Sequence, residues 1–223
     1  MALNILYEDN HLLVVEKPIG MLTQADYTHD VDLLTLLKLY LKDKYQKPGQ
    51  VYLGLVHRLD RMTGGVMVFA KTSKAASRLA RQIQDKKWSK KYYAVVSGKL
   101  PLNGHLENYL YKDEQEVKSY VGNAKNGKLA ILDYQTIGYH RNTSLVDVTL
   151  QTGRHHQIRV QFSHIGHPLV GDVLYGSTHQ QNLMLFAYAL SFEHPISKER
   201  LYFQIAPHDQ NWIAYDAYFC KKN

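Results

Sequence analysis

The sequence contains a single cysteine, Cys220, among its 223 residues. One thiol cannot form an internal disulfide, so the fold must rest on its core, and this usage fits a reducing compartment. No stretch approaches the roughly 20 apolar residues of a membrane span. The first residues, MALNILYEDN, lack the basic and apolar segments of a signal peptide. These absences predict a cytoplasmic protein without a membrane partner.

Internal repeats and linkers rich in proline, glycine or serine are also missing. The length allows one large domain or two small ones. Hydrophobic residues make up 45% and charged residues 21%, which is typical of a globular protein and excludes a disordered one. Because no change in composition divides the chain, we expect residues 1–223 to form a single domain, with a monomer as the default state.

Acidic residues are few relative to basic ones. Lysine and arginine total 27 and aspartate and glutamate total 20, for a formal net charge of +7. An excess of this size favours an anionic partner, with nucleic acid first. Charge alone does not distinguish an enzyme that acts on nucleic acid from a protein that only binds it.

The hydrophobic pattern predicts many strands and few helices. Strands are expected at residues 4–8, 12–16, 51–56, 66–71, 91–97, 129–137, 144–151, 183–192 and 200–206, with short strands and loops at 104–127. Helices are expected at 30–46, capped by Asp30 or Asp32, at 74–86, capped by Ser73, and in HHQIRVQFSHIG, which ends at Gly166. Because the helices do not alternate regularly with the strands, we expect an α+β fold. Its central sheet should be mixed and mainly antiparallel, with flanking helices and loops.

The segment HRLDRMTGG is the first of three that can carry chemistry. Asp60 lies near Arg58 and Arg61 on a polar turn between two apolar strands. Neighbouring cations keep a carboxylate ionised. An ionised carboxylate suits a nucleophile or an electrostatic stabiliser better than a general acid. On its own, the segment is more typical of a surface turn with a salt bridge.

The second segment, GRHHQIR, follows a strand and opens a helix, where arginine and histidine favour anions such as phosphate. Arg154 and Arg159 are five residues apart, so they need not point the same way. Several histidines cluster between residues 155 and 167. Their spacing matches no common zinc pattern, and we therefore expect no metal.

In the third segment, KKYYAVVSG, basic residues run directly into a strand with two adjacent tyrosines. Neighbours in a strand face opposite ways, so Tyr92 and Tyr93 cannot share a face. One can pack in the core while the other stacks on a base.

Taken together, in this order and spacing, the three segments resemble the RluA family of RNA pseudouridine synthases. HRLDRMTGG is similar to the family's H-R-L-D-x-x-T-S-G, and KKYYAVVSG is similar to its K-x-Y-x-A-x-V-x-G strand. TGRHHQIRVQFSHIGHPLVGDVLYG resembles its G-R-x-H-Q-I-R-V-H…G-H-P-I-x-G-D-x-x-Y-G segment, and YEDNHLLVVEKPIGM the start of its catalytic domain. Four motifs agree, and the resemblance spans roughly residues 4–206.

This resemblance implies the pseudouridine synthase catalytic fold and the isomerisation of uridine to pseudouridine within ribosomal or transfer RNA, without a cofactor. It implies that Asp60 is the catalytic carboxylate, Tyr92 the active-site tyrosine and Arg154 the basic residue that pairs with the aspartate. Whether Asp60 attacks the sugar or the base, or removes the 2′ proton, stays open. The substrate-binding residues implied are Arg58, His57, Thr63, Gln157 and Arg159.

The departures from the family pattern are small. Gly64 replaces the usual Ser, His155 the usual Thr or Ser, and Gln161 the usual His. They affect substrate contacts and leave the reaction class unchanged. The family often carries an N-terminal S4 RNA-binding domain, which we expect to be missing here. RNA phosphates would then be held by the domain's own basic residues, including those of segment 74–87.

Two other functions fit parts of the sequence. A non-catalytic RNA-binding protein on the same fold would explain the net charge, but it would have no evident use for the carboxylate of Asp60. A metal-dependent hydrolase built on the histidines is the weakest hypothesis, because the spacing of carboxylates and histidines does not support it.

Overall fold

The computed structural model describes residues 3–113, 115–179 and 181–219, so Cys220 lies outside the described residues. The chain separates into two compact units. Unit 1 comprises Met1–Trp88 and Ala189–Ile205, and unit 2 comprises Ser89–Tyr188 and Ala206–Asn223. The single domain expected over residues 1–223 stays a prediction.

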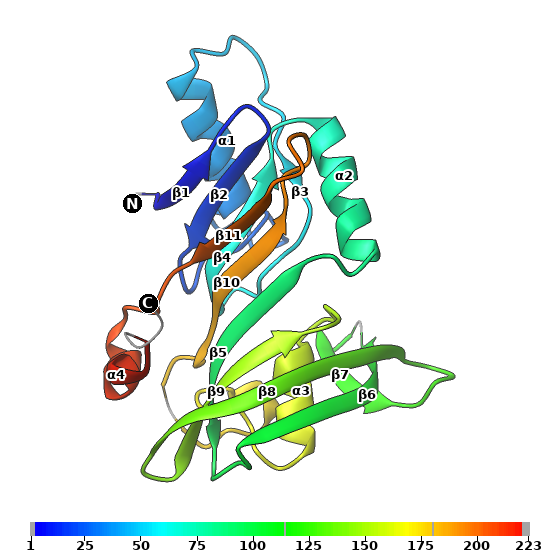
Figure 1. Cartoon of the computed structure of the whole chain (residues 1–223), viewed down its shortest axis with the longest axis vertical. Coiled ribbons are helices and arrows are strands. Elements are labelled where there is room, and N and C mark those ends of the chain that lie inside the picture. The colour runs from blue at the N-terminus through cyan, green and yellow to red at the C-terminus, as the bar shows by residue number, and fades with distance from the viewer. Residues whose placement is uncertain (1–2, 114, 180, 220–223) are drawn as a thin grey trace. The chain divides into compact units, whose positions relative to one another are not determined.

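Unit 1 is built on a sheet with the strand order β1-β2-β4-β10-β11, and β3 also pairs with β4 (Figure 1). The strands are β1 (Ile5–Glu8), β2 (Leu12–Lys17), β3 (Gly54–Leu55), β4 (Gly64–Ala70), β10 (Leu185–Glu193) and β11 (Arg200–Gln204). Only the last five residues of β10 lie in this unit. The β1–β2, β2–β4, β3–β4 and β10–β11 pairs are antiparallel.

Two capped helices complete unit 1: α1 (Leu33–Lys44) and α2 (Ser73–Gln84). The Asp32 side chain accepts a hydrogen bond from the Thr35 N–H, as one of the two expected caps. The second helix is capped by Thr72, and the expectation of Ser73 is wrong by one residue. Thr72 still has an extended backbone and accepts from the Ala75 N–H, which makes Ser73 the first helical residue.

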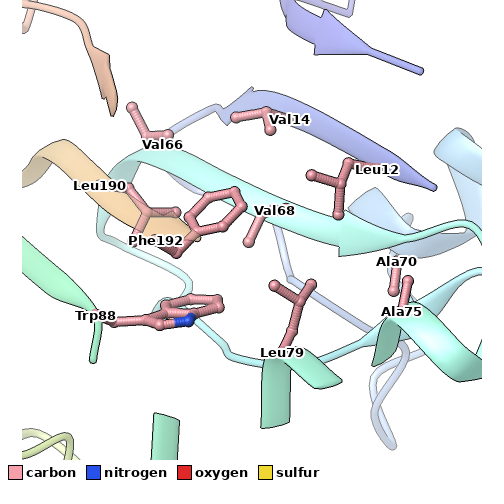
Figure 2. Close-up of a cluster of buried hydrophobic side chains, with 10 residues drawn as sticks. All are labelled: Leu12, Val14, Val66, Val68, Ala70, Ala75, Leu79, Trp88, Leu190 and Phe192. Atoms are coloured by element: carbon pink, nitrogen blue, oxygen red, sulfur yellow. The ribbon is translucent and has the colours of Figure 1, made fainter. Parts of the chain in front are cut away.

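A hydrophobic cluster joins α2 to the sheet of unit 1 (Figure 2). Its buried members are Leu12, Val14, Val66, Val68, Ala70, Ala75, Leu79, Trp88, Leu190 and Phe192. Burying a Val, Leu or Phe side chain contributes about 1.5–3 kcal/mol. All seven residues of β4 are buried, so both faces of the strand that follows the Asp60 turn are packed. The turn that contains Asp60 is therefore attached to a strand that is packed on both faces.

Unit 2 holds an antiparallel sheet in the order β5-β9-β8-β6-β7, with the first four residues of β10 beside β5. The strands are β5 (Ser89–Ser97), β6 (Asn103–Asp113), β7 (Lys118–Gly122), β8 (Lys128–His140) and β9 (Thr143–Leu150). The helical segments are α3 (Gln157–His164), α4 (Asp216–Phe219) and the 3₁₀ turns η1 (Val173–Tyr175) and η2 (Gln210–Tyr215).

Two strand predictions need correction. The strand expected at 51–56 is only two residues long, because only Gly54 and Leu55 pair with β4. The region 104–127 contains all but the first residue of an eleven-residue strand, β6, where short strands and loops were expected. Its alternation is masked in the sequence because the inward side of β6 includes Gly104 and Asn108. Within the described residues, no helix is long and apolar enough to cross a membrane.

Candidate active site

In unit 1, the predicted site residues lie on the turn between β3 and β4. Asp60 is half-buried, and the Thr63 N–H donates to its carbonyl oxygen over 3.0 Å, which closes the turn. On the other side, the Thr23 hydroxyl donates to the Leu59 carbonyl over 2.8 Å. The backbone on both sides of the carboxylate is therefore hydrogen-bonded to the protein.

Lys17 lies against this turn, and the sequence analysis missed it. Its side chain is 0% exposed, and Nζ donates to the carbonyls of Pro18 (2.9 Å), Met21 (2.6 Å) and Arg61 (3.0 Å). Three acceptors match the three N–H groups of an ammonium. Burial lowers the pKa of Lys17 to about 7, and the Asp60 carboxylate opposes the shift. The available signal was a lysine that ends the apolar strand in VVEKP.

The other predicted residues of this turn differ in their contacts. His57 Nε2 accepts from the Val68 N–H over 3.1 Å, and its ring meets Trp88 edge-on at a centroid distance of 5.3 Å. These contacts join the turn to β4 and to Trp88, which follows α2. Arg58 is exposed and forms no hydrogen bond or ion pair with any described residue, which leaves it available to an anion. Thr63 is buried, and its hydroxyl has no hydrogen-bond partner among the residues that the structure describes.

In unit 2, the two adjacent tyrosines of β5 point to opposite faces of the sheet. Tyr92 pairs with Val148 and Tyr93 with Asp147 across β9. Tyr93 is 2% exposed and stacks on Tyr188 with ring centroids 3.8 Å apart and planes at 8°. Tyr93 is committed to packing, while Tyr92 is 9% exposed, and its role as the active-site tyrosine stays a prediction.

Two cations accompany Tyr92. Lys90 precedes it by two residues and shares its face of the strand. Burial and the nearby Arg154 guanidinium lower the pKa of Lys90. A Cβ at Gly153 would lie 2.9 Å from Lys90 Nζ, so glycine permits this approach. Arg154 is exposed and its Nε donates to the Leu129 carbonyl over 2.8 Å. The face around Tyr92 therefore favours an anion.

Gln157 is 3% exposed, and all its polar atoms bond to the protein. Its Oε1 accepts from the Thr152 hydroxyl (2.8 Å) and the Arg154 N–H (3.0 Å), and its Nε2 donates to the Ile131 carbonyl (3.0 Å). These contacts support a role in positioning Arg154. Direct contact with substrate stays a prediction.

Arg159 forms a two-point ion pair with buried Asp172, both bonds being 2.7 Å. Its guanidinium also lies over the Tyr175 ring, 5.0 Å from the centroid. Tyr175 Oη accepts from the Ser119 N–H and is 2.9 Å from His156 Nδ1. Burial is the main cause that lowers the pKa of His156 to about 2, and the positive charge of Arg159 lowers it further. His156 is therefore neutral near pH 7, and the phosphate contact expected of Arg159 stays a prediction.

The predicted residues thus form two groups. His57, Arg58, Asp60 and Thr63 share one turn of unit 1. Tyr92, Arg154, Gln157 and Arg159 belong to unit 2, where Gln157 bonds to the backbone of Arg154. Among the described residues, no three metal-ligating side chains come together. His155, His156 and His167 have other hydrogen-bond partners, which are Ser119, Tyr175 and the Ser97 carbonyl.

Known proteins resemble the chain over most of its length. The sequence model of a family described as RNA pseudouridylate synthase matches residues 11–164. The ribosomal large subunit pseudouridine synthase D of Zymomonas mobilis is 37% identical over 217 residues, which cover 91% of this chain and 68% of the relative. The tRNA pseudouridine synthase C of Pasteurella multocida is 35% identical, and the alignment covers 96% of this chain and 94% of the relative.

The chain belongs to the RNA pseudouridylate synthase family. This assignment confirms the resemblance found in the sequence motifs. Solved structures of human RNA pseudouridylate synthase domain containing 4 and domain containing 1 match with TM-scores of 0.76 and 0.72. They are 22% and 24% identical, and each alignment covers 92% of this chain and 88% or 84% of the human one. Both confirm the predicted α+β pseudouridine synthase fold.

Proposed function

We propose that this pseudouridylate synthase isomerises specific uridines to pseudouridine in structured ribosomal or transfer RNA, with Asp60 as the catalytic carboxylate. The observation that carries this assignment is the turn itself. Thr23 and Lys17 hydrogen-bond to the backbone on either side of Asp60. A carboxylate on a backbone fixed in this way is preorganised, which is what a catalytic group requires and a surface salt bridge does not.

The reaction needs no redox change. The N1–C1′ bond breaks, the uracil turns, a C5–C1′ bond forms, and the C5 proton is lost while N1 gains one. Asp60 would act on the sugar or the base, or remove the 2′ proton. The uridine must first leave its stack, at a cost of a few kcal/mol.

Tyr92 would stack on the extruded uracil, a contact worth about 1–3 kcal/mol, and its hydroxyl would help to move the C5 proton. Arg154 and Lys90 would supply positive charge beside it. Arg58 would bind a phosphate near the extruded nucleotide, because its guanidinium is exposed and unpaired within the described protein. The cytoplasmic location and the monomeric state stay predictions.

The test uses purified chain with unmodified transcripts of transfer RNA and large-subunit ribosomal RNA. Asp60→Ala and Asp60→Asn should form no pseudouridine while keeping RNA affinity. Retained turnover in Asp60→Ala would show that Asp60 is not the catalytic carboxylate. Pseudouridine mapping of host RNA, with the gene deleted and restored as wild type or Asp60→Ala, would name the target. If the purified wild type also formed no pseudouridine, the non-catalytic RNA-binding function would replace this one.

A further inference from the structure

We infer that the exposed side of α2 and the turn after it bind phosphates of the RNA substrate. This inference rests on the proposed function and adds a location for the RNA strand. Segment 73–87 contains Lys74, Arg78, Arg81, Lys86 and Lys87 but only one acid, Asp85. Its net charge of +4 exceeds half of the +7 of the whole chain. Such local excess is the usual electrostatic mark of a nucleic-acid surface.

The cations of α2 share one side of the helix. Lys74 and Arg81 are exposed and two turns apart, with exposed Ser77 between them. They are separated by about 10 Å along the axis. The opposite side, including Ala75 and Leu79, is buried in the core (Figure 2). The helix therefore presents a basic stripe whose length matches roughly three nucleotides of a stacked strand.

Carboxylates leave most of these charges unneutralised. Lys74, Lys86 and Lys87 are exposed, and none forms an ion pair with a described residue. Arg81 and Asp85 are 4.0 Å apart, and the Arg81 side chain is 83% exposed, so this pair is weak. Phosphate oxygens can bind these cations without displacing a strong partner.

The surface is rigidly mounted. Gln82 exchanges two hydrogen bonds with the backbone of Glu193, and Arg78 donates to the Pro195 carbonyl. Lys86 has a left-handed backbone, φ +55°, at the position after a helix end where glycine is usual. A lysine is strained in this left-handed conformation, whereas a glycine is not. The chain thus has a lysine at a position where the backbone conformation alone favours glycine.

The turn also connects this surface to the candidate catalytic residue. Trp88 follows Lys87, and its ring contacts His57, which lies three residues before Asp60. Arg200 fixes the same turn by donating to the Lys87 carbonyl over 2.8 Å. RNA whose uridine reaches Asp60 would meet Lys87 first and continue along α2.

Helix α1 provides a matched comparison. It and its C-terminal turn also carry four lysines, Lys38, Lys42, Lys44 and Lys47, and two of them contact other groups of the protein. Lys44 pairs with Glu8, and Lys44 and Lys47 lie over the Tyr45 ring. Lys38 and Lys42 complete the set of lysines on this helix. A variant neutralised here loses the same formal charge as one neutralised on α2.

The experiment compares two triple variants of the full chain. One carries Lys74→Gln, Lys86→Gln and Lys87→Gln, and the other carries Lys38→Gln, Lys42→Gln and Lys47→Gln. Dissociation constants for an unmodified transfer RNA transcript and a large-subunit ribosomal RNA transcript are measured from 0.05 to 0.5 M salt. Each lost phosphate contact lowers the slope of log affinity against log salt by about 0.7–0.9.

For the α2 triple, we expect the slope to fall by about 2–3 and affinity at 0.1 M salt to fall on the order of 100-fold. The α1 triple should stay within about threefold of wild type. Equal losses in both triples, or an unchanged slope in the α2 triple, would overturn the inference. Lys→Arg at the three α2 positions should restore affinity. If circular dichroism shows that the α2 triple is unfolded, the three single variants replace it, each with a slope change of about 0.7–0.9.

Binding is measured separately from turnover. Failure of the proposed function would appear as a wild-type chain that binds RNA and forms no pseudouridine. Failure of the inference would appear as an active wild type whose α2 cations are dispensable for binding.

Discussion

Replacing Lys17 with methionine should destabilise unit 1 and stop turnover together. Methionine fills a similar volume but donates no hydrogen bond, so the carbonyls of Pro18, Met21 and Arg61 lose the Lys17 donor, and the Arg61 carbonyl next to Asp60 keeps its hydrogen bond from the Gly20 N–H. Leaving a buried carbonyl without a donor costs about 1–3 kcal/mol for each group affected. This is a large share of the roughly 5–15 kcal/mol that stabilises a typical domain.

The measurement is urea unfolding of wild type and Lys17→Met, together with pseudouridine formation at a temperature where both remain folded. Lys42→Met is the control, because Lys42 is exposed on α1 and its replacement should change stability by less than about 0.5 kcal/mol. A Lys17→Met chain with wild-type stability and wild-type turnover would refute the claim that Lys17 holds the Asp60 turn.

The pH dependence supplies a second check on Lys17. Its pKa of about 7 lies below the value of about 10.4 for lysine in an unfolded chain. Between these values the unfolded chain binds more protons, so this group makes the free energy of unfolding rise with pH from about 7 to about 10. Turnover should change the other way. As pH rises through about 7, Lys17 loses an N–H and the charge beside Asp60, so turnover should fall. Lys17→Met should lack the titration in its unfolding curve.

Three further predictions concern unit 2 and metal. Tyr92→Phe should lower kcat by about 100-fold if its hydroxyl moves a proton, while Tyr93→Phe, which keeps its ring stacked on Tyr188, should stay near wild type; the reverse pattern would show that the assigned register is wrong. Gln157→Leu leaves the Arg154 N–H without its acceptor and removes one of the donors to the Ile131 carbonyl, so it should cost about 1–3 kcal/mol in urea unfolding and lower kcat more than affinity. Chelator should leave pseudouridine formation unchanged, and a loss restored by zinc would contradict the prediction of no metal.

Much of the fold could be predicted because its information is local. Alternation and β-branched runs mark β2, β4 and β9, and helical spacing marks α1 and α2. Side chains alone could not place the cap at Thr72 in preference to Ser73, since both residues are good caps and the choice depends on backbone geometry. Strand β6 was underestimated because its inward side is partly polar.

The residues of the candidate site likewise differ in whether local sequence identifies them. Asp60 and Tyr92 stand in motifs and could be named from the sequence. Lys17 could not, because its acceptors are backbone carbonyls and one of them lies 44 residues away. The positioning contacts of Gln157 likewise depend on carbonyl and amide groups whose place is set only by the folded sheet. A sequence pattern carries no information on which backbone groups converge on a side chain.

The same distinction decides how the net charge should be interpreted. Lys17 and Arg159 are cations whose hydrogen bonds end on the protein's own carbonyls and carboxylates, so they stabilise the fold. Arg58, Lys74 and Lys87 are exposed and form no ion pair with a described residue. Only cations of the second kind release counterions when RNA binds. The salt dependence of RNA binding should therefore follow these exposed residues and not the total of +7.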